Sequence, residues 1–577
     1  MRKYFSLALL CLIVSVAAWC QDHFNQTGND SLYIQDSVLI KTRDGALISA
    51  IIARKKGPTA PQPCILSFTI YARVTDMHRR CNDAAWHGYV GVVAYTRGKR
   101  QSPNESIPYE YDGRDVFDVI EWITKQPWCN GKVGMYGGSY SGFTQWAATK
   151  NLHPALKTIV PSASVAPGLD VPMTNNVVMS FVFPWTYYVT NNKLLDEKDY
   201  RDTIWRATYF KWFATGTSYT SLDSILGRRP NKVFRTWLKH PAYDAYWQNM
   251  ISYKDEFAKI NIPVLTTTGY FDDGQIGAMY YFREHYKYVP GAEHYLLIGP
   301  YGHFGSQGFP DSIYAGYPID PVARISIHDI IFQWFDYVLK GASKPSLLKD
   351  KINFEVMGAN EWKHVSSYKK MSNDTLKFYL SDQRIDTGYY LKKEPPRKTN
   401  SVQQMVDFSD RSTMNFYLWN FRLTWDSVNG SNGIVYVSDP LQNDVIISGA
   451  FIGEIKASIN KKDFDFSINL FEQMPDGKLF YLSYFMGRAG YAKNILKRHL
   501  LTPGKIESIP FQNSYITVKK LSNGSRIVAL VNVNKSPFEQ INYGTGKDVN
   551  DETINDAKEP LRVKWYNSSY IKIPILK

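Results

Sequence analysis

The sequence predicts an α/β domain that is interrupted by a mostly helical segment and followed by an all-β sandwich. Three observations predict this order: short apolar runs alternate with amphipathic helices, an aromatic-rich stretch without strand alternation interrupts them, and short alternating strands fill the rest of the chain. At roughly 150 residues per domain, the 577 residues leave room for two to four domains. The expected boundaries are a signal peptide over 1–20, the α/β domain over 21–161 and 255–345, a helical cap over 162–254 and the sandwich over 346–577.

The composition is that of a large globular protein. Hydrophobic residues make up 44% and aromatic residues 15%, which argues against long disordered tracts, and no fixed-period repeat occurs. The net charge of +14 comes from lysines and arginines spread along the chain, so we expect a solvated basic face and no nucleic-acid partner. The mature chain keeps Cys64, Cys81 and Cys129. One bridge, such as Cys64 with Cys81, is possible, but three buried thiols are the favoured interpretation.

The N-terminus has the pattern of a secretory signal peptide. A positive start, Met1-Arg2-Lys3, precedes about 15 apolar or small residues from Tyr4 to Trp19, fewer than the ~20 that a membrane span needs. We therefore expect an exported protein, periplasmic or secreted, without an integral membrane span. A lipid anchor on Cys20 is the alternative, but the bulky Trp19 stands where such cleavage sites take a small residue.

The α/β domain begins with two antiparallel strands between Asp36 and Ala53, joined by a turn at Arg43-Asp44-Gly45. Nearly continuous apolar runs then indicate buried core strands, and apolar residues on one face indicate helices. The expected core strands are Cys64–Phe68, Gly91–Tyr95, Lys132–Tyr136, Pro263–Thr268 and His294–Ile298, and the expected helices are Asp115–Lys125, Phe143–Lys150 and Val322–Leu339. Gly341 can end the last helix.

Two other regions complete the chain. Between Ser162 and Ile251, aromatic-rich and helix-like segments such as Asp199–Phe213 predict the cap. After Pro345, turn signals at Asp476-Gly477 and elsewhere separate short alternating strands. The expected strands are Ile352–Met357, Leu376–Leu380, Val445–Ile459, Phe464–Leu470, Leu479–Phe485, Ser514–Lys519 and Arg526–Val533.

A serine lies in a glycine-rich connection of the α/β domain. The segment Gly137-Gly138-Ser139-Tyr140-Ser141-Gly142 joins a core strand to a helix, and a sharp turn there would lift the Ser139 hydroxyl to the edge of the sheet. The backbone N–H of Tyr140 can point at a developing oxyanion. The strict Gly-x-Ser-x-Gly pattern is not met, because position 141 is serine and the glycine comes one residue later. The segment predicts a nucleophile elbow, and a plain strand-to-helix connection is the alternative.

A serine nucleophile needs a base, and the base needs a carboxylate that orients it. Asp272 follows the core strand at 263–268, and His303 follows the core strand at 294–298, at the carboxyl ends where such sheets hold their functional groups. The order Ser139, Asp272, His303 is the order of triads in hydrolases of this architecture. A turn former at Asp272 and a loop residue at His303 are the structural alternatives.

These residues lie within longer blocks that resemble a known family. The chain is similar, over most of its mature length, to the serine hydrolases that include bacterial cocaine esterase, alpha-amino acid ester hydrolases, glutaryl cephalosporin acylases and Xaa-Pro dipeptidyl-peptidases. The matching blocks are Tyr71, Gly88–Val90, Arg97-Gly98, Glu121-Trp122, Gln126–Met135, Gly138–Tyr140, Gly142, Gly269–Asp272, Gly299-Pro300, His303, Trp334–Asp336, Leu339–Gly341, Met357–Asn360 and Trp362. The resemblance implies an α/β-hydrolase domain, a helical cap and a C-terminal jelly roll.

The resemblance also implies roles for single residues. Ser139 is the nucleophile, His303 the general base and acid, and Asp272 the orienting carboxylate. Tyr71 would donate its phenolic O–H to the oxyanion beside the Tyr140 N–H, and the alternative is a half-buried tyrosine at a strand end. No metal and no organic cofactor are implied.

The sequence departs from this family at positions that select the substrate. Amino acid ester hydrolases hold a substrate ammonium with carboxylates two residues after the oxyanion tyrosine and just beyond the catalytic Asp, and these positions are Arg73, Gly274 and Gln275 here. That mode of cation binding is not predicted, although Asp273 could supply one charge. Arg73 could instead favour an anionic acyl group, but a solvated arginine is the favoured interpretation. Asp273 also competes with Asp272 for the orienting role.

We therefore expect an exported serine hydrolase that cleaves an ester or amide bond of a small molecule or short peptide through an acyl-enzyme. A dipeptidyl-peptidase that releases Xaa-Pro is the runner-up. It needs an acid for the N-terminal ammonium of the peptide, and Asp273 and Asp170 are the candidates. A non-catalytic protein that binds a glycan or polymer is the alternative of another class, but the full set of catalytic residue types in sequence order argues against it.

Overall fold

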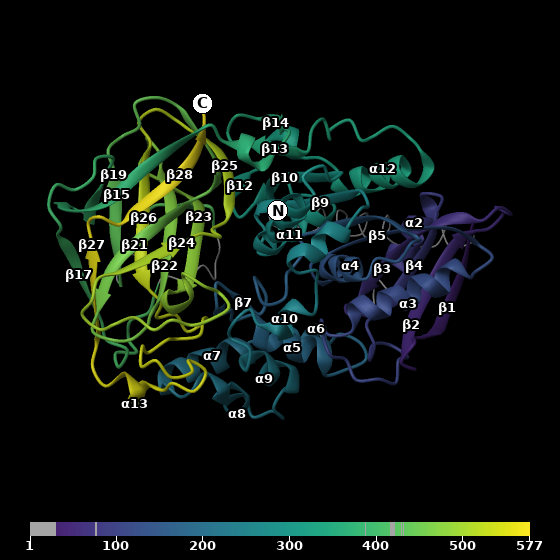
Figure 1. Cartoon of the computed structure of the whole chain (residues 1–577), viewed down its shortest axis with the longest axis horizontal. Helices are drawn as coiled ribbons and strands as arrows, with labels where there is room; N and C mark the ends of the chain where they lie inside the picture. The colour runs from purple at the N-terminus through teal and green to yellow at the C-terminus, as the bar shows by residue number, and fades with distance from the viewer. Residues whose placement is uncertain (1–30, 75–77, 387, 416–421, 429, 431) are drawn as a thin grey trace, which may run out of the picture.

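A ten-stranded sheet forms the centre of the α/β domain (Figure 1). The computed structural model describes residues 31–74, 78–386, 388–415, 422–428, 430 and 432–577. The predicted signal peptide, 1–20, and the alternative anchor at Cys20 lie outside these residues. The strand order is β1-β2-β4-β3-β5-β6-β9-β10-β13-β14, and the run from β4 to β13 is parallel throughout. This sheet with its covering helices confirms the predicted α/β-hydrolase class.

The predicted hairpin and core strands are all present in this sheet. Its strands are β1 (Leu32–Lys41), β2 (Leu47–Lys55), β3 (Gln62–Thr69), β4 (Val90–Tyr95), β5 (Cys129–Gly138), β6 (Leu156–Ser162), β9 (Val264–Phe271), β10 (His294–Gly302), β13 (Ile352–Val356) and β14 (Glu361–Val365). The helices that cover it are α2 (Arg79–Trp86), α3 (Asp112–Thr124), α4 (Tyr140–Lys150), α11 (Gln275–Tyr288) and α12 (Ile327–Lys340). Strands such as β3 are buried along almost their whole length, because helices cover both faces of a parallel sheet.

The cap lies between β6 and β9 in the chain and is mostly helical. Figure 1 shows its helices grouped below the α/β sheet and beside the lower end of the β-rich region. Its elements are β7 (Met173–Thr174), β8 (Val177–Val178), α5 (Val182–Thr190), α6 (Glu197–Tyr200), α7 (Ile204–Thr215), η2 (Tyr219–Ser221), α8 (Leu222–Leu226), α9 (Lys232–Leu238), α10 (Ala245–Gln248) and η3 (Lys254–Lys259). The helix expected over 199–213 is split at 201–203: Asp196 caps the start of α6, and the Asp202 side chain accepts from the Ile204 N–H at 2.9 Å, where α7 begins.

Residues 374–577, which we call the β domain, form a fourteen-stranded sheet system with almost entirely antiparallel pairing. The strands are β15 (Asp374–Ile385), β16 (Gly388–Lys392), β17 (Ser401–Val406), β18 (Thr424–Trp425), β19 (Gly433–Ser438), β20 (Val445–Ala450), β21 (Ile452–Ile459), β22 (Asp465–Gln473), β23 (Leu479–Arg488), β24 (Glu507–Phe511), β25 (Ile516–Leu521), β26 (Arg526–Val533), β27 (Leu561–Tyr566) and β28 (Tyr570–Leu576). The predicted β-rich C-terminal region is confirmed, and a jelly-roll order of its strands stays a prediction.

The expected boundary at 345/346 does not coincide with the border between the two sheets. Strand β13 pairs in parallel with β10, and β14 pairs with β13, so both strands extend the α/β sheet. The residues of β13 are buried along its whole length, as in the other parallel strands. The prediction that 352–357 belongs to the sandwich, made from its alternating pattern, was therefore wrong. The partner of a strand depends on the connection before it, here through α12, and not on the strand's own residues.

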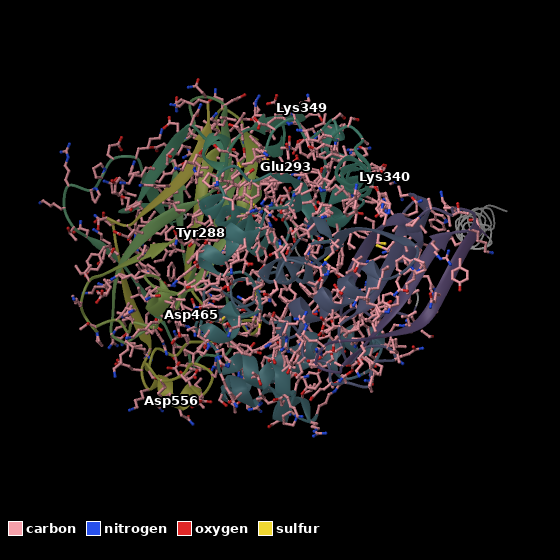
Figure 2. The ribbon with its side chains drawn as sticks, turned by 45° about the vertical axis from the view of Figure 1, so that its right-hand side comes forward. Tyr288, Glu293, Lys340, Lys349, Asp465 and Asp556 are labelled. Atoms are coloured by element: carbon pink, nitrogen blue, oxygen red, sulfur yellow. The ribbon has the colours of Figure 1, made fainter. Side chains whose placement is uncertain are left out.

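A buried ion pair stabilises the part of the β domain that faces the cap. Asp465 at the start of β22, labelled in Figure 2, accepts hydrogen bonds from Nε and Nη2 of Arg488 at 2.8 and 3.0 Å. Nη2 of Arg488 also donates to Oε1 of Gln540 at 2.8 Å. Arg488 thus connects the end of β23 with residues 534–541, which we call the β26 loop.

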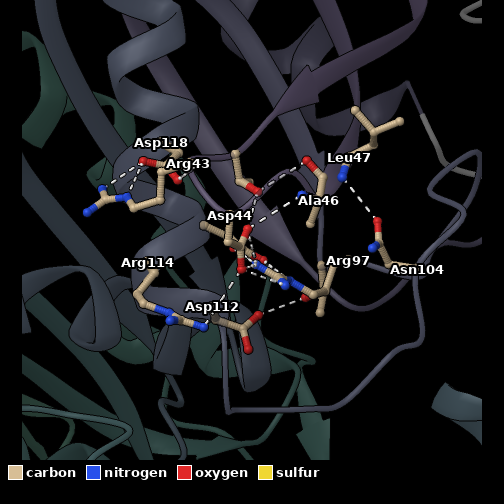
Figure 3. Close-up of polar contacts among 12 residues, drawn as sticks. Arg43, Asp44, Ala46, Leu47, Arg97, Asn104, Asp112, Arg114 and Asp118 are labelled. Atoms are coloured by element: carbon tan, nitrogen blue, oxygen red, sulfur yellow. Dashed lines mark hydrogen bonds and ion pairs between the residues drawn. The ribbon is translucent and has the colours of Figure 1, made fainter.

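A second buried network fixes the β1–β2 turn against α3 (Figure 3). Arg97, which follows β4, donates from Nε to Asp115 at 2.8 Å and from Nη1 to Asp44 at 3.1 Å. Near it, Arg43 donates from Nε to Asp118 at 2.8 Å. The side chain of Asp115 is 1% exposed, whereas that of Arg43 is 56% exposed. Arg97 is therefore a structural residue that neutralises a buried carboxylate.

We expect Arg97→Met to lower the free energy of unfolding by about 3–5 kcal/mol, because it leaves Asp115 buried without its counter-ion. Urea unfolding followed by circular dichroism measures the change. The matched control is Arg43→Met, which removes a largely exposed cation from its pair with Asp118 and should cost about 0–1 kcal/mol. Equal losses for the two variants would contradict the structural role of Arg97.

Two further expectations concern the state of the cysteines and the presence of a membrane-spanning helix. Cys64, Cys81 and Cys129 are buried free thiols, which confirms the favoured interpretation and leaves no bridge between Cys64 and Cys81. In the part of the chain that the structure describes, no helix combines the length and the apolar character that crossing a membrane requires.

Candidate active site

Ser139 lies at the sharp turn between β5 and α4. Its backbone has φ 60° and ψ −121°, a conformation that non-glycine residues rarely adopt and that marks a strained, functional turn. A Cβ at Gly142 would approach the carbonyl oxygen of Ser162 to 2.9 Å, so this position requires glycine. Ser141 instead points inward, where its hydroxyl donates to Thr69 Oγ1 at 2.9 Å. The departure from the strict elbow pattern is thus accommodated in two ways: Ser141 hydrogen-bonds to the end of β3, and Gly142 fits against the end of β6.

His303 follows β10 directly, and its ring contacts two carboxylates. Nδ1 of His303 is 2.8 Å from Oδ1 of Asp272 and 2.8 Å from Oδ1 of Asp273. The contact with Asp272 has the geometry of a hydrogen bond. Asp272 is fully buried and accepts two further hydrogen bonds, from Thr268 Oγ1 at 2.7 Å and from the Gly274 N–H at 2.9 Å. Because these donors fix its carboxylate, Asp272 is the better placed of the two to orient the ring.

Asp273 is the more exposed acid, with 59% of its side chain accessible. Burial lowers the pKa of His303, but the facing carboxylates of Asp273 and Asp272 outweigh that effect and hold the pKa well above its usual range. The same attraction to His303 outweighs desolvation at Asp273, whose pKa is lowered. The three side chains also form a group with the donor types of a metal site. In this structure Nδ1 of His303 contacts both carboxylates directly, as in an imidazole that is oriented by acids.

Tyr71 lies two residues beyond the end of β3, and its side chain extends to the serine. Its hydroxyl oxygen lies 3.4 Å from Oγ of Ser139. The Tyr71 N–H donates to Thr69 Oγ1 at 3.1 Å, which fixes the backbone at the end of the strand. Tyr140 is the first residue of α4, and its own hydroxyl is held by Asp112 Oδ2 at 2.8 Å deep in the core. The Tyr140 side chain is therefore structural, and its backbone N–H is the group available at the helix start.

A cavity of about 1180 Å³ joins these residues, and all three parts of the chain line it. The α/β domain contributes Ser139, Asp273 and His303. The cap contributes aromatic side chains such as Trp185 and Tyr188. Pockets for small molecules are usually about 300–1,000 Å³, so this cavity has room for a small molecule or a short peptide.

The β domain supplies a wall of this cavity that the sequence analysis did not identify. Ser467 and Asn469 on β22, Tyr484 on β23 and Asn532 on β26 are cross-strand neighbours, and Glu539 of the β26 loop joins them. In the sequence, polar residues at alternate positions of a strand indicate a face in contact with water. Only the arrangement of the domains shows that this face borders the cavity.

Two residues considered for substrate charge are already engaged. Nε of Arg73 donates to Glu197 at 2.8 Å, so its charge is balanced by the cap. Asp170 is buried and accepts from the backbone N–H groups of Ala166 at 2.6 Å and Gly277 at 3.0 Å. Arg73 is therefore paired with Glu197 and is not the merely solvated arginine that was expected. Both oxygens of Asp170 are occupied by backbone donors, and burial raises its pKa well above the usual range, so Asp170 is removed as an ammonium acceptor.

Comparison with known proteins agrees with this architecture. Residues 44–305 match the X-Pro dipeptidyl-peptidase (S15 family), and residues 348–555 match the X-Pro dipeptidyl-peptidase C-terminal non-catalytic domain. The chain is 24% identical over 586 residues to the cocaine esterase of Rhodococcus sp. (strain MB1 Bresler), covering 94% of this chain and 99% of that protein. It is 23% identical over 531 residues to a putative serine esterase of Mycobacterium bovis, covering 78% and 79% of the two chains.

Solved structures share the whole arrangement. An alpha-amino acid ester hydrolase superposes with a TM-score of 0.79 at 21% identity, over 94% of this chain and 97% of that one. An aminopeptidase from a marine sediment archaeon, Thaumarchaeota archaeon, superposes with a TM-score of 0.78 at 20% identity, over 95% and 97%. With both parts of the chain matched in order and the fold shared over its length, this chain belongs to the S15 X-Pro dipeptidyl-peptidase family of serine hydrolases.

Proposed function

We propose that the protein hydrolyses an ester or amide bond of a small molecule or short peptide through an acyl-enzyme on Ser139. The observation that carries the proposal is the meeting of three groups in one cavity: a strained serine, a tyrosine hydroxyl 3.4 Å from its Oγ, and a histidine held by a buried carboxylate. Nucleophile, oxyanion donor and oriented base are the parts that acyl transfer needs.

The reaction uses each part in turn. Oγ of Ser139 attacks the substrate carbonyl carbon while His303 takes the hydroxyl proton, and His303 returns that proton to the departing alcohol or amine. Water then attacks the acyl-enzyme with His303 again as base, which releases the acid and restores Ser139. Asp272 holds the imidazole in the tautomer with its proton on Nδ1 and stabilises the imidazolium. No cofactor takes part in these steps.

The oxyanion of each tetrahedral intermediate accepts hydrogen bonds from the Tyr71 hydroxyl and the Tyr140 N–H in this mechanism. We expect Tyr71→Phe to lower kcat about 10²–10³-fold with little change in KM, because the donor acts mainly in the transition state. Steady-state hydrolysis of a nitrophenyl ester measures both constants. The matched control is Tyr253→Phe, at a tyrosine of the cap directly before η3 that is not among the residues lining the cavity. A loss of less than threefold in the Tyr71 variant would contradict this role.

The test of the function is labelling of the purified protein with a fluorophosphonate, mapped by peptide mass. A short-chain nitrophenyl ester and an Ala-Pro nitroanilide are assayed in parallel. Labelling of Ser139 with ester turnover supports the proposal, and the ratio of the two substrates separates an esterase from a dipeptidyl-peptidase. No labelling and no turnover would refute it and would favour a non-catalytic binding protein.

Release of Xaa-Pro from peptides is the second candidate, because both family matches carry that description. It needs an acid for the peptide ammonium. With Asp170 enclosed in backbone hydrogen bonds, Asp273 is the remaining acid of the two named from the sequence.

The apolar N-terminus supports a further proposal, that the protein is exported, and N-terminal sequencing of the mature protein from its host would test it.

A further inference from the structure

An acidic side chain of the β domain faces the cavity without a partner for its charge. Glu539 lies in the β26 loop, where its backbone forms a bridge with Met179 of the cap. The next residue, Gln540, is held by Arg488 at 2.8 Å and donates its N–H to Val178 at 3.4 Å. The position of Glu539 is therefore fixed from both the cap and the β domain.

The Ser536 side chain interacts with the Glu539 carboxylate, but one carboxylate oxygen keeps no partner and the charge has no counter-ion among the described residues. Oε2 is buried and has no hydrogen-bond partner among the described residues, and no ion pair joins Glu539 to a lysine, arginine or histidine of that part of the chain. Asn532, which is 3% exposed and lines the same cavity, likewise has an unpartnered Oδ1. Unpaired buried acceptors cost free energy, so two of them in one cavity wall indicate that a ligand supplies the missing donors.

Aromatic rings complete this part of the cavity. Tyr484 and Tyr515 stack with ring centroids 4.9 Å apart, and both line the cavity. Burial raises the pKa of Tyr484, and the nearby charges of Glu539 and Asp273 contribute, so that it reaches about 12. Tyr484 is thus close both to Glu539 and to Asp273, the acid beside His303. Aromatic rings close to a carboxylate are a combination that binds ammonium groups.

We propose that Glu539, with Tyr484 and Asn532, binds a cationic group of the substrate, a quaternary ammonium or a protonated amine, whose ester or amide bond lies at Ser139. A protonated amine balances the Glu539 charge and can donate N–H groups to the unpartnered acceptors of Glu539 and Asn532. A quaternary ammonium has no N–H, and the carboxylate charge and the aromatic rings attract it. A neutral or anionic group does not balance the charge. This site lies in the β domain, apart from the positions of Arg73, Gly274 and Gln275. The inference rests on the proposed hydrolysis and adds the substrate class.

Matched pairs of substrates test the inference. The first pair places the charge in the acyl half: 4-nitrophenyl 6-(trimethylammonio)hexanoate and its neutral isostere, 4-nitrophenyl 7,7-dimethyloctanoate. The second pair places it in the leaving group: butyrylcholine and 3,3-dimethylbutyl butyrate. The value of kcat/KM is measured for each compound with the wild type, Glu539→Gln, and Asp551→Asn, which removes an exposed negative charge of the same domain outside the cavity.

We expect the wild type and Asp551→Asn to prefer the cation at least tenfold in one of the pairs. Glu539→Gln should lose that preference while its kcat/KM for the neutral partner stays within about threefold. No preference in either pair, or a preference kept by Glu539→Gln, would overturn the inference. If the wild type hydrolyses none of the four compounds, the proposed hydrolysis fails instead. Titration with hexyltrimethylammonium chloride then decides the binding site: tighter binding by wild type than by Glu539→Gln supports it, and equal affinity overturns it.

The pH dependence of the preference gives a second measurement. Burial raises the pKa of Glu539 to about 7, so its charge is gained as the pH rises through neutrality. The titratable side chains that face it are Tyr484 on β23 and Tyr219 on η2, and both tyrosines have raised pKa values and stay neutral in this range. The ratio of the paired substrates cancels the titration of His303. We expect this ratio to rise between pH 6 and 8 in the wild type and to stay flat in Glu539→Gln; a flat ratio in the wild type would contradict the role of Glu539.

Discussion

Replacement of Ser139 by alanine is expected to lower kcat for ester hydrolysis by about 10⁵–10⁶-fold, because the variant cannot form the acyl-enzyme. The oxyanion donors and the cavity remain, so a residual rate of about 10³-fold above the uncatalysed reaction is expected. Initial rates with a nitrophenyl ester measure the loss, and mass spectrometry after rapid quenching shows whether an acyl adduct accumulates.

The neighbouring Ser141 is the matched control for this prediction. Its hydroxyl is buried and donates to Thr69, so it is a structural serine of the same turn. Ser141→Ala should keep kcat within about tenfold of the wild type and should still be labelled by a fluorophosphonate. If the Ser141 variant were the inactive one and Ser139→Ala retained turnover, the assignment of the nucleophile would be wrong.

Asp272→Asn is expected to lower kcat about 10³–10⁴-fold, whereas Asp273→Asn should cost less than about tenfold. Both acids lie 2.8 Å from Nδ1 of His303, but Asp272 is buried and fixed by Thr268 and Gly274, while Asp273 is largely exposed. An amide at 272 can donate to Nδ1 and thereby favours the wrong tautomer. Losses in the reverse order would make Asp273 the orienting residue.

The pH profile of kcat/KM tests how Asp273 acts on His303. His303 acts as a base only when it is neutral, and the charges of Asp273 and Asp272 raise its pKa against the opposing effect of burial. The acidic limb of kcat/KM in the wild type should therefore lie above the usual range of histidine. Asp273→Asn removes one of those charges, so it lowers the pKa of His303 and should shift the acidic limb to lower pH. An unshifted limb would mean that Asp273 does not act on the base.

Local patterns in the sequence determined much of this protein. Continuous apolar runs such as 64–68 and 91–95 predicted core strands because both faces of a parallel strand are covered. Ser139, Asp272 and His303 could be named because each directly follows such a strand, and parallel strands bring their carboxyl ends to one edge of the sheet.

Tertiary structure alone decided the rest. Strand 352–356 joined the α/β sheet because its partner is β10, and no property of its own residues specifies that partner. The choice between Asp272 and Asp273 required burial and hydrogen-bond donors that come from Thr268 and Gly274. Glu539 carries no motif, and it became a candidate binding residue only when the cap and the β domain enclosed it in the cavity that Ser139 also lines. A sequence pattern reports the local surroundings of a residue, whereas a binding cavity is formed by side chains far apart in the chain, and its charge balance exists only after folding.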